Sequence, residues 1–401
     1  MFYKIYFHIT IPPELQIRNT LSKKIIYYWS PFLSPIATCK SVINSAGSLM
    51  QFETNYQCYI FNFFGEFNQF DQEIKKKKIK FLDLYNFSIA KFLPYKGKIQ
   101  SRFSFFMIFL LGFFPLIKSL KKNRPDFLII HLITSLPLII LLFFNFDTKF
   151  ILRISGYPKM NLFRKFLWKL AFKKIYKVTC PTQSTLSYIK SLNIISDKKI
   201  SLLYDPIINV AEVNNKKKEF IYQDKDYFLA VGRLTKQKDF IFLCKAFKKL
   251  IKKNKDIKVL IAGTGEDKKK ISNYLKINGL DQNIILLGHV ENIFPYFVNA
   301  KAFILTSLWE DPGFVLVEAA FSRTLILSNN SKPGANELIK NNYNGLVYKQ
   351  GNIDDFHSKF EEIYNLKNVN TLKINSLKNI KKFTLFSHYQ QIKKLILERE
   401  I

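Results

Sequence analysis

A short cationic loop stands between a predicted strand and a predicted helix in the second half of the chain. The strand DYFLAVG ends at Gly232, and Arg233 and Lys238 follow in the run GRLTKQKDF before a helix begins at Asp239, a suitable N-cap. Backbone amides at a helix N-terminus favour an anion even before side chains contribute. Two added cations would neutralise a departing diphosphate. The loop predicts a phosphate site, and the alternative is a pair of ordinary solvated surface cations.

Two glutamates follow in the run SLWEDPGFVLVEAAF, with seven residues between them. Glu310 precedes a turn at Gly313, and Glu318 lies in the helix predicted after that turn. Carboxylates accept hydrogen bonds from vicinal hydroxyls, which sugars and ribose present. At helical rise the carboxylates are on the order of 10 Å apart, which suits two parts of one long ligand. The alternative, a loop charge and a surface glutamate, explains less well why Glu318 stands in the apolar run VLVEAAF.

Alternating strand and helix patterns must position these loops. Strand-like runs occur in the first half at 25–29, 58–64, 79–85, 126–132, 149–155, 176–180 and 199–204, and in the second half at 226–231, 258–263, 284–288, 302–306 and 324–329. Strands separated by helices predict parallel, doubly wound sheets. A polar stretch over 205–225 predicts the linker. We therefore expect an α/β protein of two Rossmann-like domains, 1–208 and 209–385, with an amphipathic helix over 386–401 that crosses back to the first domain.

Other side chains at strand ends would face a cleft between the two expected domains, because functional loops gather at the carboxyl edge of such sheets. In the first half these are His131, Arg153, Ser155 and Gly156. Arg153 is a candidate for anion contact, whereas a lone histidine on an apolar segment is more often structural. In the second half, Asn336 and Glu337 stand in a loop that closes on the bound ligand or is simply exposed.

The runs GRLTKQKDF and EDPGFVLVEA, in that order, resemble the signature of retaining glycosyltransferases of family 4, whose GT-B fold consists of two facing Rossmann-like domains. IAGTGEDKKKI at 261–271, LGHVENIFPYFVNA at 287–300 and GANELIKNNYNGLVY at 334–348 resemble the intervening and following blocks. The resemblance is strong over 226–350 and mainly architectural before it. The first half departs from the pattern: SPFLSP at 30–35 replaces a glycine-rich loop, and Ser155-Gly156 stands where many relatives have a histidine.

The resemblance implies roles for the matched residues. The expected donor site consists of Gly232, Arg233, Lys238, Gly263, His289, Glu310, Gly313, Phe314, Val315 and Glu318. Arg233 and Lys238 would bind the donor diphosphate, Glu318 the ribose, and Glu310 the transferred sugar. Arg233, Lys238 and Glu310 would be the catalytic residues. The resemblance also implies retention of anomeric configuration by front-face substitution, a UDP-type donor and no metal, since the cationic loop takes the ion's role.

The composition bears on partners and compartment. The formal net charge is +32, but the lysines recur along the whole chain beside isoleucine and asparagine, which indicates either an AT-rich genome or selection for an anionic membrane surface rather than a nucleic-acid partner. The N-terminus MFYKIYFHITIPP has no signal-peptide pattern, so we expect a cytoplasmic protein. Cys39, Cys58, Cys180 and Cys244 are widely spaced, as expected of free thiols.

Two apolar stretches raise the question of a membrane span. Phe103 to Ile117 is shorter than the roughly 20 residues that a bilayer requires. Phe127 to Phe146 is long enough, but it contains polar residues and follows Pro125-Asp126 like a buried strand that runs into a helix. We expect both in a soluble core, where they could also help the protein lie on a membrane.

Together these features predict a retaining glycosyltransferase that moves a hexose or N-acetylhexosamine from a nucleotide-diphosphate sugar to a glycan acceptor. The expected acceptor is lipid-linked, at the cytoplasmic face of a bacterial membrane, in the synthesis of lipopolysaccharide, O-antigen, capsule or exopolysaccharide. One alternative is another GT-B enzyme, such as a sugar-nucleotide epimerase. The other is a non-catalytic basic protein that binds membranes or nucleic acid.

Overall fold

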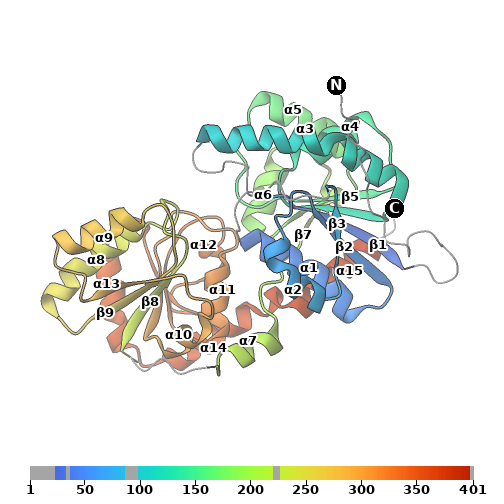
Figure 1. Ribbon diagram of the computed structural model, residues 1–401. Coiled ribbons are helices and arrows are strands. Elements are labelled where there is room, and N and C mark those ends of the chain that lie inside the picture. The colour runs from blue at the N-terminus through green and yellow to red at the C-terminus, as the bar shows by residue number, and fades with distance from the viewer. Residues whose placement is uncertain (1–22, 33–36, 86–97, 220–225, 398–401) are drawn as a thin grey trace.

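The chain folds into two α/β domains, shown by the computed structural model in Figure 1, which describes residues 23–32, 37–85, 98–219 and 226–397. The predictions for the first residues, for part of the loop at 30–35 and for the last residues therefore lie outside the described residues. Both domains are parallel sheets flanked by helices, so the expected fold class is confirmed.

The N-terminal domain is built on a seven-stranded sheet with the order β3-β2-β1-β4-β5-β6-β7. Its strands are β1 (Lys24–Trp29), β2 (Tyr56–Asn62), β3 (Lys80–Asp83), β4 (Phe127–Ile130), β5 (Lys149–Arg153), β6 (Lys177–Cys180) and β7 (Ile200–Leu202). Side chains of β1 alternate between two cores: Tyr27 and Trp29 belong to one, and Ile26 and Tyr28 to the other. A strand with both faces buried has a continuous apolar sequence, and for this reason the run IIYYW could be predicted as a strand.

Helices cover both faces of this sheet. One face carries α1 (Ala37–Phe52), α2 (Asp71–Lys76) and the C-terminal helix α15 (Leu385–Leu397). The other carries α3 (Lys98–Asn123), α4 (Ser135–Phe143), α5 (Leu162–Lys174) and α6 (Gln183–Ser191). Short 3₁₀ helices lie at Asn68–Phe70, Asp197–Lys199 and Lys381–Phe383.

Helix α3 is longer than the apolar stretch 103–117 suggested. It has 26 residues and continues through Pro115 to Asn123. Its segment Arg102–Asn123 has 22 residues and a mean hydropathy of 2.0, enough by length and composition to cross a membrane, and 39% of that apolar window is buried in the protein. The expectation of a segment too short for a bilayer is therefore wrong. The second stretch is confirmed as strand β4 followed by helix α4.

The C-terminal domain has a six-stranded sheet with the order β10-β9-β8-β11-β12-β13. The strands are β8 (Tyr227–Val231), β9 (Lys258–Ala262), β10 (Ile284–Gly288), β11 (Ala302–Leu305), β12 (Ile326–Asn329) and β13 (Leu346–Tyr348). The helices are α8 (Phe240–Lys253), α9 (Lys268–Ile277), α10 (Phe294–Asn299), α11 (Phe314–Phe321), α12 (Ala335–Leu338), α13 (Ile353–Asn365) and α14 (Val369–Asn379). The predicted N-cap of α8 is confirmed: the Asp239 side chain accepts a hydrogen bond from the Phe242 amide at 3.3 Å.

The chain crosses between the domains at two neighbouring places. The Ile208 amide donates to the Phe383 carbonyl at 3.0 Å, and the Leu385 amide donates to the Ile208 carbonyl at 3.0 Å. Helix α15 then packs on α1 of the N-terminal domain. The stretch expected to be a linker is partly helical, because Asn209 caps a short helix, α7 (Val210–Lys216).

Candidate functional site

Loops at the carboxyl edge of the C-terminal sheet are joined by backbone hydrogen bonds. The loop after β8 contacts the loop after β9, where the Leu234 amide donates to the Thr264 carbonyl at 2.9 Å. It also contacts the loop after β11, where the Leu308 amide donates to the Gln237 carbonyl at 2.7 Å. The Thr306 hydroxyl donates to the Lys238 carbonyl at 2.7 Å. These bonds hold Lys238 beside the segment that carries the first glutamate.

Two glycines allow this close packing. A Cβ at Gly263 would lie 1.9 Å from the Gly232 carbonyl oxygen, and one at Gly334 would lie 2.2 Å from the Pro312 carbonyl oxygen. No larger residue fits at either position without a shift of the backbone. Gly232 and Gly263 were expected at the donor site, and in the structure their close approach brings two loops into contact.

The cationic loop and the first glutamate meet directly. The Lys238 ammonium donates to the Glu310 carboxylate, and the two side chains are only 12% and 7% exposed. Arg233 is exposed on the same loop, and no carboxylate in the described part of the chain pairs with it. The site therefore contains one buried ion pair and one cation that is open to a ligand.

The second glutamate lies close to cations from both domains. Glu318 is half-buried on α11, and burial raises its pKa to about 7. The positive charges of Lys40, Lys238 and Lys216 act in the opposite direction. Lys40 belongs to α1 of the N-terminal domain and Lys216 to α7, so Glu318 faces the space between the domains.

The N-terminus of α11 points its amides into the same region. The helix follows Gly313, whose φ of 99° is a left-handed conformation that favours glycine, and no side chain caps it. Phe314 and Val315 in its first turn are partly exposed. An anion at this end would accept hydrogen bonds from the uncapped amides.

His289 lines a pocket of about 600 Å³. The pocket is lined by Lys216, Glu219, Leu287, His289, Val290, Glu291, Asn292 and Tyr296. Lys216 thus lies near Glu318 and also lines the pocket that contains His289. The histidine itself is exposed, and its position is consistent with a contact to one end of a long ligand.

Two carboxylates of the C-terminal domain accept hydrogen bonds from the N-terminal domain. Asp311 accepts hydrogen bonds from the Gly156 amide and, at 2.8 Å, from the Thr185 hydroxyl. Glu337 accepts from the Gln183 and Ser184 amides at 3.1 and 3.2 Å, at the N-terminus of α6. Gly156 therefore lies at the cleft as expected. Its neighbour Ser155 is exposed, and so is Asn336 in the C-terminal domain.

His131 and Arg153 are placed differently from the expectation. Both are buried in the N-terminal domain, around a small cavity that Asp205 and His388 also line. The Arg153 guanidinium donates two hydrogen bonds to the Asp205 carboxylate, one of them at 2.7 Å. Burial, with the Arg153 charge beside it, holds the pKa of His131 well below its usual value. Arg153 is thus already neutralised by a carboxylate, and His131 is a neutral core residue.

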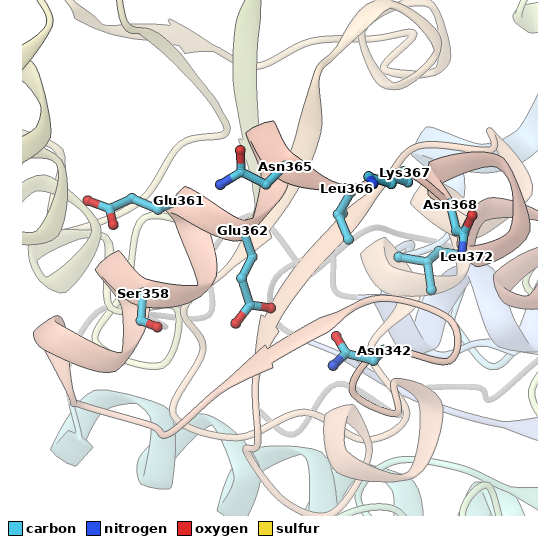
Figure 2. A pocket seen from close by; sticks show the side chains of 9 residues that line it. All are labelled: Asn342, Ser358, Glu361, Glu362, Asn365, Leu366, Lys367, Asn368 and Leu372. Atoms are coloured by element: carbon cyan, nitrogen blue, oxygen red, sulfur yellow. The ribbon is translucent and has the colours of Figure 1, made fainter.

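A separate pocket of about 510 Å³ lies in the C-terminal domain next to α13 and α14 (Figure 2). Its polar lining includes Glu361, Glu362, Asn365 and Lys367. None of the residues expected to hold a donor contributes to it. Among the described residues, no group of three or more His, Cys, Asp or Glu side chains is arranged to hold a metal ion.

Three residues of this region are not indicated by any pattern in the sequence. Asp311 follows Glu310 directly, yet a loop carboxylate before proline has no pattern that predicts a contact in another domain. Lys40 and Lys216 are two of the 62 basic residues, and only the fold brings them to Glu318.

Comparisons with known proteins agree with this architecture. Residues 212–382 match the family model of the glycosyl transferases group 1. An uncharacterized glycosyltransferase of Methanocaldococcus jannaschii is 27% identical over 306 residues, which cover 70% of this chain and 75% of that protein. A Campylobacter jejuni GalNAc-α-(1→4)-GalNAc-α-(1→3)-diNAcBac-PP-undecaprenol α-1,4-N-acetyl-D-galactosaminyltransferase is 27% identical over 299 residues, 73% of this chain and 78% of that protein. HepE of Anabaena, solved with UDP and glucose, superposes with a TM-score of 0.68 over 92% of this chain and 98% of its own, at 13% identity.

Proposed function

Because the chain is a group 1 glycosyltransferase with the GT-B fold, we propose that it is a retaining enzyme of family 4 that uses a UDP-sugar. The sugar is a hexose or an N-acetylhexosamine. The acceptor is a lipid-linked glycan at the cytoplasmic face of a bacterial membrane, which is supported by relatives of this chain that act on undecaprenol-linked glycans. The product is a surface polysaccharide or its precursor, consistent with a capsular polysaccharide relative of Staphylococcus aureus.

The observation that carries this proposal is the Lys238–Glu310 ion pair near the uncapped start of α11, with Glu318 on the same helix and under the electrostatic influence of Lys238. A diphosphate at this end gains the helix amides and the Arg233 charge. From there the ribose hydroxyls reach the Glu318 carboxylate, and the base occupies the pocket beside His289. The transferred sugar lies on the other side, next to Glu310.

The reaction that this arrangement serves is a substitution on one face of the sugar. The bond between the anomeric carbon and the diphosphate oxygen breaks, and the acceptor hydroxyl oxygen bonds to the same face of that carbon. The hydroxyl proton passes to the departing phosphate oxygen. Arg233 and Lys238 stabilise the charge that develops on the diphosphate, and Glu310 orients the sugar hydroxyls.

A transfer assay with radiolabelled UDP-sugars and a lipid-linked glycan tests the proposal. Wild-type protein should transfer sugar only when the acceptor is present, with retained configuration. Arg233→Ala should lower kcat/KM by roughly a hundredfold, because an exposed cation that contacts the leaving group is lost. Lys236→Ala, a neighbouring exposed cation, is the matched control. An epimerised sugar and free nucleotide formed without acceptor would instead support an epimerase.

The raised pKa of Glu318 predicts a pH dependence of donor binding. Below about pH 7 the free protein carries a protonated Glu318, which accepts hydrogen bonds from ribose hydroxyls poorly. The Kd for a UDP-sugar should therefore rise by up to about tenfold per pH unit below 7 and be flat above it. Because the folded pKa exceeds the unfolded one, this carboxyl also makes the unliganded protein less stable as the pH rises from 4.5 to about 7.

Isothermal calorimetry across this pH range measures the effect. Glu318→Gln should bind the UDP-sugar more weakly at every pH, and the slope below pH 7 should disappear. A slope that persists in Glu318→Gln would assign the titration to another group.

A further inference from the structure

The helices α3, α4 and α5 share a layer whose outer surface is unusually apolar. Eight large side chains on it are between 50% and 88% exposed. They are Phe103, Phe106, Leu110 and Phe114 of α3, Phe143 of α4, and Leu162, Phe163 and Phe166 of α5. Helix α4 packs against both α3 and α5, so these residues form one continuous surface, which we term the α3–α5 face.

The apolar side chains are arranged by helical spacing and continue into lysines. Phe103, Phe106, Leu110 and Phe114 recur at intervals of three and four residues and so form one stripe along α3. Exposed Lys118 and Lys121 continue the same spacing. On α5, Leu162 and Phe166 are followed in the same way by exposed Lys169 and Lys173. An apolar patch continued by cations is complementary to an anionic lipid surface, not to water.

The direction of the helices places the apolar end at the cleft. In a parallel sheet the connecting helices run opposite to the strands, so each begins at the carboxyl edge, where the cleft lies. Helix α5 begins six residues after Gly156, which donates to Asp311 across the cleft. Leu162, Phe163 and Phe166 occupy its first turns, whereas Lys169 and Lys173 lie toward the far edge. The N-terminal end of α3 likewise lies on the side of the C-terminal domain in Figure 1.

From this geometry we propose that the α3–α5 face docks on an anionic lipid bilayer, with its phenylalanines in the interfacial region and its lysines on the headgroups. The docked protein presents the mouth of its cleft to the membrane surface. This inference rests on the proposed function, because a lipid-linked acceptor remains in the bilayer while its glycan enters the cleft. The two remain separable, since docking and transfer can be measured independently.

Vesicle sedimentation with the full chain tests the docking. Phe106→Ser, Phe114→Ser, Phe163→Ser and Phe166→Ser, combined in one variant, should lower partition onto vesicles of phosphatidylglycerol and phosphatidylethanolamine by roughly tenfold or more. The control variant, Ile277→Ser with Ile374→Ser, changes exposed apolar residues of the C-terminal domain and should bind like wild type. Equal partition of the phenylalanine variant and wild type would overturn the proposal.

The lysines are tested in the same way. Lys169→Gln with Lys173→Gln should weaken binding to these vesicles by roughly tenfold, whereas Lys268→Gln with Lys269→Gln, on α9, should not. Wild type should bind phosphatidylcholine vesicles weakly. If both lysine pairs weaken binding equally, general basicity and not this face explains the attraction. If the bound protein resists extraction by alkaline carbonate, α3 spans the bilayer and the docking proposal is wrong.

Two further measurements separate docking from transfer. The phenylalanine variant should transfer sugar normally to a water-soluble, short-chain acceptor and at least tenfold more slowly to a long-chain acceptor in vesicles. No transfer to either acceptor by wild type would contradict the proposed function and leave the vesicle result standing. Light scattering reports whether the face is instead covered by a second copy: a wild-type dimer that becomes a monomer in the phenylalanine variant would overturn docking on lipid.

Discussion

Replacing Lys238 with methionine should lower kcat/KM for sugar transfer by about a thousandfold, the upper end of what the loss of one donor to a developing anion costs. The Lys238 ammonium is the cation paired with Glu310 near the start of α11, and in the proposed reaction the diphosphate gains negative charge there as the sugar departs. Methionine keeps most of the length and the apolar stem of the side chain and removes the ammonium group, with its charge and its hydrogen-bond donors. Single-turnover rates with saturating donor measure the chemical step directly.

The same variant should also be less stable, and the two effects must be separated. Removing one partner of a buried ion pair leaves the other charge uncompensated and costs about 3–5 kcal/mol. The Lys238–Glu310 pair is largely buried, so Lys238→Met leaves the Glu310 carboxylate without its cation. Adding Glu310→Gln removes that charge and should restore much of the free energy of unfolding in urea.

Activity should not return with stability. The double variant lacks both the cation proposed to bind the diphosphate and the carboxylate proposed to orient the sugar, so its kcat/KM should stay at or below that of Lys238→Met. Recovery of transfer together with stability would mean that Lys238 acts only by neutralising Glu310. Transfer within tenfold of wild type in Lys238→Met alone would remove it from the catalytic machinery.

Much of this site could be predicted because its determinants are local in the sequence. Phe240, Leu243 and Phe247 recur at helical spacing, a pattern that predicts one buried helix face, and all three are buried in α8. A loop between strand and helix has a known place at the carboxyl edge of a parallel sheet, which brings Lys238 and Glu310 together although 72 residues separate them. For these residues, local sequence patterns are sufficient to predict the position once the fold class is known.

The remaining features depend on contacts that no local pattern records. The single carboxylate of Asp311 receives an amide and a hydroxyl from the other domain, and nothing around it in the sequence identifies the partners. Helix α3 continues through the buried Pro115, although proline inside a helix usually marks a break. Lys40 has no distinctive context in a chain rich in lysine.

Arg153 illustrates how an interpretation from position alone can be incomplete. Its place at the end of β5 favours a role in the cleft, but burial requires a counter-charge, and the nearest carboxylate comes from Asp205, 52 residues later. Asp205 also accepts a hydrogen bond from the Ser41 hydroxyl at 3.0 Å. The pair therefore ties β5 and α1 to the segment where the chain leaves the N-terminal domain.

Arg153→Met should lower the free energy of unfolding of the N-terminal domain by about 3–5 kcal/mol, because Asp205 is left charged and only 2% exposed. Denaturation in urea, followed by circular dichroism, measures this loss. Arg153→Met combined with Asp205→Leu removes both charges and should regain much of it, since a buried ion pair replaced by apolar groups of similar volume is often no less stable.

Donor binding distinguishes this structural role from a role in the cleft. At a temperature where Arg153→Met is folded, its Kd for a UDP-sugar should lie within about twofold of the wild-type value, because the guanidinium is buried and engaged by Asp205. A large rise in Kd with no loss of stability would show that Arg153 leaves its carboxylate to contact the diphosphate. The buried pair would then be a resting arrangement, and closure of the domains on the donor would have to break it.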